Sequence, residues 1–294
     1  MAVLSPAEQQ QFWRDGWLFM PDAVDASCLK ELRSDFAAWV EESRSHSKPY
    51  GQTIDGRPRF DVEPGHSAAK PALRRVNSPT EISAAYYRAM SATRMADAVA
   101  DLIGPDVKFH HSKINSKLPG AATAVKWHQD FPFTPHSNDD IVTALLFVDE
   151  VTDDNGPLEL DPGTHKSEIL SLWNGDVFTA AVGDDFAAAS QAKAVRCTGP
   201  AGGVCFMHTR VLHGSAPNRS AHPRTLFISV YTAEDAVALA PNPVPSKHEG
   251  RIVRGRQTGN IRSIAYEMRL PQKPTVASFF GQQSGAEKKP EYNF

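Results

Sequence analysis

The feature that most constrains the fold is a change of pattern at Gly104-Pro105. Before it, apolar residues recur at helical spacing, most clearly in the segment that starts at Ala26. After it come short runs rich in β-branched residues, separated by turns of Gly, Pro, Asn and Asp. Helices followed by strands predict an α+β chain, mainly β, with an antiparallel sandwich or barrel at its centre.

The expected elements follow from these patterns. Helices are predicted over 6–15 and from Ala26 for about four turns, with a strand over 17–20 between them. Ser78 to Glu81 has the form of a capping box with Pro at the first helical position, which predicts one helix as far as Leu102. Strands are predicted over 107–115, 141–148, 158–160, 203–207 and 225–231.

Composition limits the classes of partner. The 31 Lys and Arg residues against 34 Asp and Glu give a formal net charge of −3, so there is no basic field to attract nucleic acid. No window reaches the roughly 18 apolar residues of a transmembrane helix, and the first residues lack the pattern of a signal peptide. We therefore expect a soluble cytoplasmic protein with neither a membrane nor a nucleic-acid partner.

The domain organisation is expected to be simple. The chain shows no internal repeat and no clean linker, which predicts a single domain over 1–294. Its parts would be a mainly helical region, 1–105, a β core, 106–232, and a C-terminal extension, 233–294. The end of that extension, from Gly281, is expected to be a loosely held tail. The three cysteines have no CxxC spacing and predict neither a disulfide framework nor a structural zinc site.

A candidate metal site begins in the stretch Val-Lys-Trp-His-Gln-Asp-Phe, residues 125–131. On a strand, His128 and Asp130 would share a face and could chelate one ion. Two imidazoles and a carboxylate on one face, with open positions, are the ligands of non-haem Fe(II) oxygenases. His-x-Asp occurs often by chance, so a distant histidine is required. The candidate is His213, expected where a strand ends at a Gly-Ser turn, with Arg224 opening the next strand.

These four residues resemble the motif of the phytanoyl-CoA dioxygenase family, which includes ectoine hydroxylase. The family has a His-x-Asp, a distal His, and an Arg eleven residues beyond that His, and His128, Asp130, His213 and Arg224 stand at these offsets. Residues 155–166, NGPLELDPGTHK, are similar to the family's strand-turn element behind the metal. The resemblance is close over about 100–232 and looser over the helical N-terminal part.

The resemblance implies a double-stranded β-helix, a cupin-like jelly roll, with the N-terminal helices packed outside and the active site in the barrel mouth. It implies that the triad binds Fe(II), with 2-oxoglutarate and O2 as cosubstrates. Arg224 would grip the remote carboxylate of 2-oxoglutarate with its planar fork of donors. Ser215 and Asn115 stand where the family contacts the same cosubstrate. The implied activity is hydroxylation of a small-molecule substrate, with release of succinate and CO2.

Several alternatives stay open at the level of the sequence. Desaturation, epoxidation and ring expansion begin from the same chemistry as hydroxylation. Halogenation is disfavoured, because Asp130 fills the position that a small residue takes in related halogenases. A non-redox jelly-roll metal enzyme, an isomerase or hydrolase, is the main alternative function, and a non-catalytic binding barrel is another. Arg224 and Ser215 argue against the first, since a hydrolase needs no carboxylate clamp at that offset.

The sequence also suggests which segments shape the pocket. Residues 45–76 lack periodicity and predict an irregular segment. A lid is expected over 45–77, together with the loop 131–140. One of His110 and His111 should face the cavity. Arg74 and Arg75 are candidates for contact with an anionic group of the substrate, although charge runs more often form solvated faces.

Overall fold

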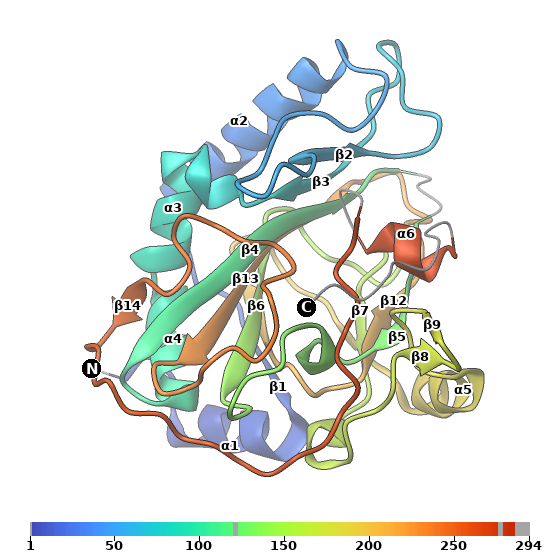
Figure 1. The fold of residues 1–294 in the computed structure, drawn as a ribbon. Helices are drawn as coiled ribbons and strands as arrows, with labels where there is room; N and C mark the ends of the chain where they lie inside the picture. Colours follow the sequence, from blue (N-terminus) through green and yellow to red (C-terminus); the bar gives the residue numbers. More distant parts are fainter. Residues whose placement is uncertain (1, 120–122, 276–278, 286–294) are drawn as a thin grey trace.

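The computed structural model describes residues 2–119, 123–275 and 279–285, which form two facing antiparallel sheets (Figure 1). The larger sheet contains, in spatial order, β1 (Trp17–Met20), β11 (Val204–His208), β6 (Ile141–Phe147), β13 (Arg224–Ala233), β4 (Val107–Lys117), β3 (Leu73–Asn77) and β2 (Phe60–Val62), and β14 (Ile252–Arg254) pairs with β4. The smaller sheet contains β10 (Val195–Cys197), β7 (Leu158–Leu160), β12 (His213–Ser215) and β5 (Val125–His128). This is the predicted jelly roll.

Four helices cover the outer face of the larger sheet. They are α1 (Pro6–Asp15), α2 (Ala26–Ser43), α3 (Ala84–Ser91) and α4 (Arg94–Ile103). Their apolar faces share one buried cluster with the sheet, in which Phe12, Leu32 and Tyr86 of the helices join Ile114 and Phe227 of the strands. The helices expected over 6–15 and from Ala26 are confirmed, and so is their position outside the barrel.

The inner face of the same strands forms a second core. Successive residues of a strand point to opposite faces, so Leu226 and Ile228 lie on the side of β13 opposite to Phe227. With Leu145 and Met207 they pack against the smaller sheet. The strands predicted over 107–115, 141–148, 158–160, 203–207 and 225–231 are all present, as β4, β6, β7, β11 and β13, with ends that differ by one or two residues.

The helix predicted from Ser78 to Leu102 is wrong. Ser78 has φ 49°, in the left-handed region, and its hydroxyl donates to the carbonyl of Pro245 instead of capping a helix. The carboxylate of Glu81 pairs with Arg59, with a distance of 2.6 Å between Oε2 and Nη2. Only a short 3-10 turn, η1 (Pro79–Glu81), forms there, and a new helix starts after Ser83, whose hydroxyl accepts from the N–H of Tyr86.

The irregular segment predicted over 45–76 contains two strands. β2 and β3 lie within or at the end of it, and β3 pairs with β4 so that Arg75 stands opposite Asn115. The segment Leu73–Asn77 carries adjacent arginines and no clear alternation, so its pairing with β4 was not visible in the pattern. The strand nevertheless brings this arginine-rich segment to the edge of the barrel mouth.

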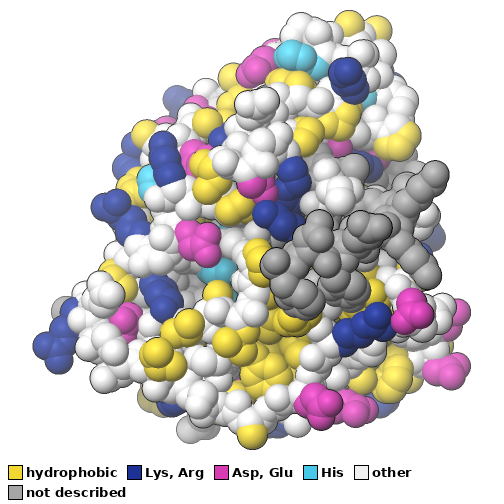
Figure 2. Space-filling view, in the orientation of Figure 1, with side chains coloured by type: hydrophobic (Ala, Val, Ile, Leu, Met, Phe, Trp, Pro, Cys, Tyr) yellow, Lys and Arg dark blue, Asp and Glu magenta, His cyan; other side chains and the backbone are white. Residues whose placement is uncertain are grey.

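The C-terminal extension runs along the lower edge of the molecule and then up across its front to α6 (Phe280–Gln283) (Figure 1). Hydrophobic side chains gather on this face below the grey residues (Figure 2). Gln283 is buried, accepts from the N–H of Lys126 and donates to the carbonyl of Ala180. The loose tail expected from Gly281 is therefore wrong for the residues up to Gln283, and its remainder, 286–294, lies outside the described residues.

Among the described residues, no helix has both the length and the apolar run that crossing a membrane requires.

Candidate metal centre and its two chambers

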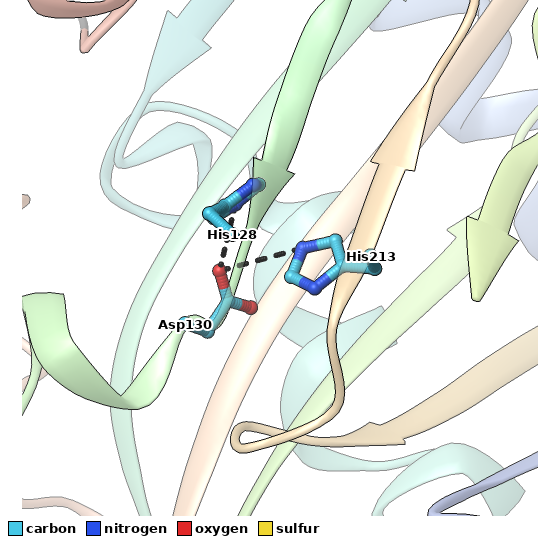
Figure 3. Close-up of side chains that lie close together, drawn as sticks. All are labelled: His128, Asp130 and His213. Atoms are coloured by element: carbon cyan, nitrogen blue, oxygen red, sulfur yellow. Dashed lines mark ion pairs between the residues drawn. The ribbon is translucent and has the colours of Figure 1, made fainter. Parts of the chain in front are cut away.

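His128, Asp130 and His213 converge at the mouth of the barrel (Figure 3). His128 ends β5 and stands opposite His213, the first residue of β12, and their ring centroids lie 4.1 Å apart. The Asp130 Oδ1 atom lies 3.5 Å from Nε2 of His128 and 3.7 Å from Nε2 of His213. Within the described residues this is the one group of three side chains with such metal-binding geometry.

The chain reaches this arrangement by a route that differs from the predicted one. β5 ends at His128, and Asp130 lies beyond it with φ −74° and ψ −33°, where the short helix η2 (Phe131–Phe133) begins. This turn, and not a continuing strand, directs the carboxylate toward the imidazoles. Similarly, His213 opens a strand, where we expected it to end one, and the Gly-Ser pair belongs to that strand.

Hydrogen bonds orient all three side chains. The Nδ1 atoms of His128 and His213 lie 2.8 Å and 3.0 Å from the carbonyl oxygens of Lys126 and Val211. A carbonyl only accepts, so each Nδ1 carries a proton, and Nε2 is the ring atom left to face the centre. The hydroxyl of Thr143 donates to Oδ2 of Asp130 at 2.8 Å, which leaves Oδ1 for an ion.

The charge states also suit a cation. Burial, with a further contribution from His128, lowers the pKa of His213 to about 4, so its ring is neutral near pH 7. Burial alone would raise the pKa of Asp130, but the nearby His213, the hydrogen bond to His128 and the charge of Lys113 hold that pKa well below its ordinary value. The site thus offers the Nε2 atoms of two imidazoles and one carboxylate.

This donor set fits Fe(II). On a first-row metal with bonds of ~2.1 Å, ligand atoms at right angles lie ~3 Å apart, so the observed separations need only a small closure. Two imidazoles and one carboxylate on one face leave positions open for a chelating cosubstrate. Thr143 was not predicted from the sequence, because a threonine in a buried strand carries no local signal of this role.

Two cavities meet at the triad. One, here named the Arg224 chamber, is lined by Arg224 and Ser215, and the other, the Arg75 chamber, is lined by Arg75 and His111. They share five lining residues, namely Lys113, His128, Asp130, Thr143 and Phe279. The metal centre therefore lies at their junction, with separate space on its two sides.

Arg224 is 3% exposed and is held by one carbonyl group. Its Nε and Nη2 atoms donate to the oxygen of Gly156 at 3.0 Å and 2.7 Å. Gly156 has φ 82°, and a Cβ atom there would lie 2.7 Å from the carbonyl oxygen of Ala216. Among the described residues Nη1 of Arg224 has no hydrogen-bond partner, so it can meet an anion in the chamber.

The other two predicted cosubstrate residues line the same chamber. The Oδ1 atom of Asn115 is buried without a partner among the described residues. Since an amide oxygen only accepts, it is the Nδ2 group of Asn115 that could donate to an anionic cosubstrate. The hydroxyl of Ser215 accepts from Nζ of Lys117 at 2.7 Å and keeps its own proton for donation. Burial, and then the charge of Arg224, lowers the pKa of Lys117 to about 6. Lys117 was missed by the sequence analysis.

The Arg75 chamber combines segments that are far apart in the sequence. Arg57 and Phe133 come from the two predicted lid segments, and His111 is the member of its pair that faces the cavity. The C-terminal extension adds a wall that was not anticipated, in which Phe279 lies 5.9 Å from the ring of His128. Phe279 is 66 residues from His213 and farther from the other two triad residues, so no local pattern predicted this contact.

Comparisons with known proteins agree with this site. A family model described as Phytanoyl-CoA dioxygenase (PhyH) matches residues 12–226. A probable alpha-ketoglutarate-dependent hypophosphite dioxygenase of Stutzerimonas stutzeri is 32% identical over 218 residues, which cover 72% of this chain and 75% of that protein. An L-proline trans-4-hydroxylase of Streptomyces griseoviridis is 29% identical over 253 residues, covering 79% of this chain and 88% of that protein.

Solved structures show the same fold. EctD from S. alaskensis in its apoform aligns with a TM-score of 0.67 at 21% identity, covering 87% of this chain and 88% of that chain. The same protein with 2-oxoglutarate and 5-hydroxyectoine aligns with a TM-score of 0.65 at 20% identity, covering 89% of each chain.

Proposed function

Since the chain belongs to the phytanoyl-CoA dioxygenase family and is an Fe(II)- and 2-oxoglutarate-dependent dioxygenase, we propose that His128, Asp130 and His213 hold its iron. One observation carries this assignment. Both Nε2 atoms and Oδ1 of Asp130 face one point, while every other polar atom of the three side chains is tied to the protein. Family membership also decides against the isomerase or hydrolase alternative.

The Arg224 chamber would bind 2-oxoglutarate. Arg224 would donate to the remote carboxylate from Nη1, since Nε and Nη2 are bound to Gly156. Ser215 and Asn115 would add neutral hydrogen bonds, and Lys117, whose Nζ donates to Ser215 and Ala216, would hold the hydroxyl of Ser215 in place. The cosubstrate would thus lie between its clamp and the metal centre, on the side away from the Arg75 chamber.

When bound, the iron supplies the redox chemistry by which 2-oxoglutarate and O2 become succinate and CO2 and a substrate C–H bond is hydroxylated. The protein orients the groups that bind the metal and the cosubstrate, and it keeps water out of the site. Leu145, Met207 and Leu226 line the Arg224 chamber with apolar surface and limit the access of water. Thr143 keeps the carboxylate of Asp130 turned toward the centre.

The substrate would be a small molecule that enters the Arg75 chamber. The relatives' names give hypophosphite, L-proline and ectoine as their substrates, which are all small. We also propose that residues 1–294 act as one domain. In support, β1, β2 and β3 of the N-terminal part and β14 of the C-terminal extension belong to the larger sheet of the barrel.

An anaerobic titration tests the assignment. The apoprotein receives Fe(II) and then 2-oxoglutarate, and the weak visible charge-transfer band of a chelated 2-oxo acid is recorded. His213→Ala should lose Fe(II) binding and the band together, whereas Arg224→Ala should keep Fe(II) and require far more 2-oxoglutarate. A wild-type protein that binds one equivalent of Fe(II) and develops no band contradicts the proposal.

A further inference from the structure

The described lining of the Arg75 chamber has more positive than negative side chains, and the proposed function gives these positive side chains no role. Its described lining contains the cations Arg57, Arg75 and Lys113 and a single carboxylate, Asp130. That carboxylate already faces the two imidazoles of the metal centre. Buried cations are costly unless they are paired, so a partner of negative charge is to be expected.

Arg75 differs from the other arginines of its segment. Arg57, Arg59 and Arg74 each form an ion pair with a carboxylate. Arg75 is 3% exposed, its Nε donates to the amide oxygen of Asn77 at 2.8 Å, and its buried Nη1 has no partner among the described residues. An unpaired donor of this kind, buried in the wall of a cavity, points to a ligand group that accepts hydrogen bonds.

Lys113 is the second unpaired cation. No hydrogen bond or ion pair to its Nζ is found within the described part of the chain, and the atom lies 5.9 Å from the ring centroid of Phe279. The guanidinium carbon of Arg75 lies 5.6 Å from the same centroid. Both cations therefore lie near one aromatic ring, which also lines the chamber.

The strand register places the two cations on one face. Arg75 of β3 stands opposite Asn115 of β4, and Lys113 is two residues from Asn115 on the same strand. Such diagonal neighbours have Cβ atoms ~7–8 Å apart, a span that one oxyanion can bridge when both side chains reach toward it. Lys113 also lines both chambers, so an anion held there would lie next to the metal centre.

The rest of the chamber suits an apolar group. Its walls include the apolar side chains of Phe133, Val230 and Val244. We propose that the substrate is a small organic acid whose oxyanion, a carboxylate or a phosphonate, binds between Arg75 and Lys113 while its apolar part faces the metal centre. This inference rests on the proposed function, which assigns the Arg224 chamber to 2-oxoglutarate.

Binding of simple probes tests the proposal without turnover. Propionate, methylphosphonate and the neutral propionamide are titrated calorimetrically into the anaerobic protein loaded with Fe(II) and 2-oxoglutarate. Both anions should bind and propionamide should not, and the tighter anion identifies the acid group. Arg75→Met and Lys113→Met should each weaken anion binding about 10- to 100-fold, the loss typical of a charged hydrogen bond, and Arg75→Lys should restore part of it.

Two controls separate this site from the cosubstrate site. Arg75→Met should still form the 2-oxoglutarate band, whereas Arg224→Met should lose the band and keep anion binding. Lys113→Met removes no hydrogen bond of the protein, so it covers the case in which Arg75→Met does not fold. Equal binding of propionamide, unchanged anion binding in both methionine variants, or loss of the band in Arg75→Met would each overturn the proposal. Absence of the band in the wild type, with anion binding that still depends on Arg75, refutes the cosubstrate assignment alone.

Discussion

The hydroxyl of Thr143 offers a sharp test of how the metal centre is built. Thr143 is 2% exposed, and its Oγ1 donates to Oδ2 of Asp130 at 2.8 Å. Thr143→Val keeps the shape of the side chain and its place in β6 but removes this hydrogen bond. The carboxylate is then free to rotate, and Oδ1 no longer has a fixed direction toward the two Nε2 atoms.

The size of the effect follows from the contact. A hydrogen bond to a charged group contributes about 1.5–3 kcal/mol, which corresponds to a loss in affinity of about 10- to 100-fold. The same range is typical when a residue that orients a metal ligand is changed. We expect the Kd for Fe(II) to rise by this factor, while 2-oxoglutarate binds the metal-loaded variant nearly as before because Arg224 is unaffected.

The assay is an anaerobic Fe(II) titration of the wild type and three variants. Thr143→Ser keeps the hydroxyl and should bind Fe(II) nearly as the wild type does. Thr209→Val is the matched control, since Thr209 lines the Arg75 chamber and its hydroxyl has no partner among the described residues. If Thr143→Val binds Fe(II) as tightly as the wild type, or Thr209→Val loses as much affinity, the orienting role of Thr143 is refuted.

Three further predictions concern the Arg224 chamber. Arg224→Lys keeps the charge but loses the planar fork, so the Kd for 2-oxoglutarate should rise about 10-fold or more with Fe(II) binding unchanged; an unchanged 2-oxoglutarate titration would contradict this. Gly156→Ala places a Cβ atom 2.7 Å from the carbonyl oxygen of Ala216, at a φ of 82° that alanine rarely adopts. It should lower the free energy of unfolding, measured with denaturant, by about 1–3 kcal/mol. Gly175→Ala is the control: at φ 58° with no atom within 4 Å of the added Cβ, it should lower the free energy of unfolding less. Lys117, with its pKa lowered to about 6, is largely neutral at pH 7.5, and the anionic cosubstrate would raise that pKa. Binding of 2-oxoglutarate should therefore take up protons, and its affinity should fall as the pH rises above 6. The proton uptake is measured by calorimetry as a binding heat that depends on the buffer. Lys117→Met should abolish this dependence.

The core of the site could be predicted because it is carried by local patterns. His128, Asp130, His213 and Arg224 are recognisable from their offsets, and the structure brings them to one barrel mouth. Short β-rich runs bounded by turn residues likewise predicted most of the strands of the larger sheet, because both signals lie within a few consecutive residues. Predictions were wrong where a residue that matches a local motif forms its hydrogen bond with a residue far away in the sequence. Ser78 has the form of a cap, yet its hydroxyl binds Pro245.

The second chamber was predicted only in part, since Arg75 and the lid segments were candidates but their assembly depended on tertiary structure. Arg75 and Lys113 are 38 positions apart, and only the antiparallel register of β3 on β4 makes them neighbours. Phe279 joins them from the C-terminal extension, and Thr143 reaches Asp130 from another strand. The sequence by itself thus predicted the fold class, the candidate metal ligands and the candidate cosubstrate clamp, because the offsets between His128, Asp130, His213 and Arg224 match those of a known family. The tertiary structure alone decided which cations remain unpaired beside the metal, because pairing depends on which distant segments fold against one another.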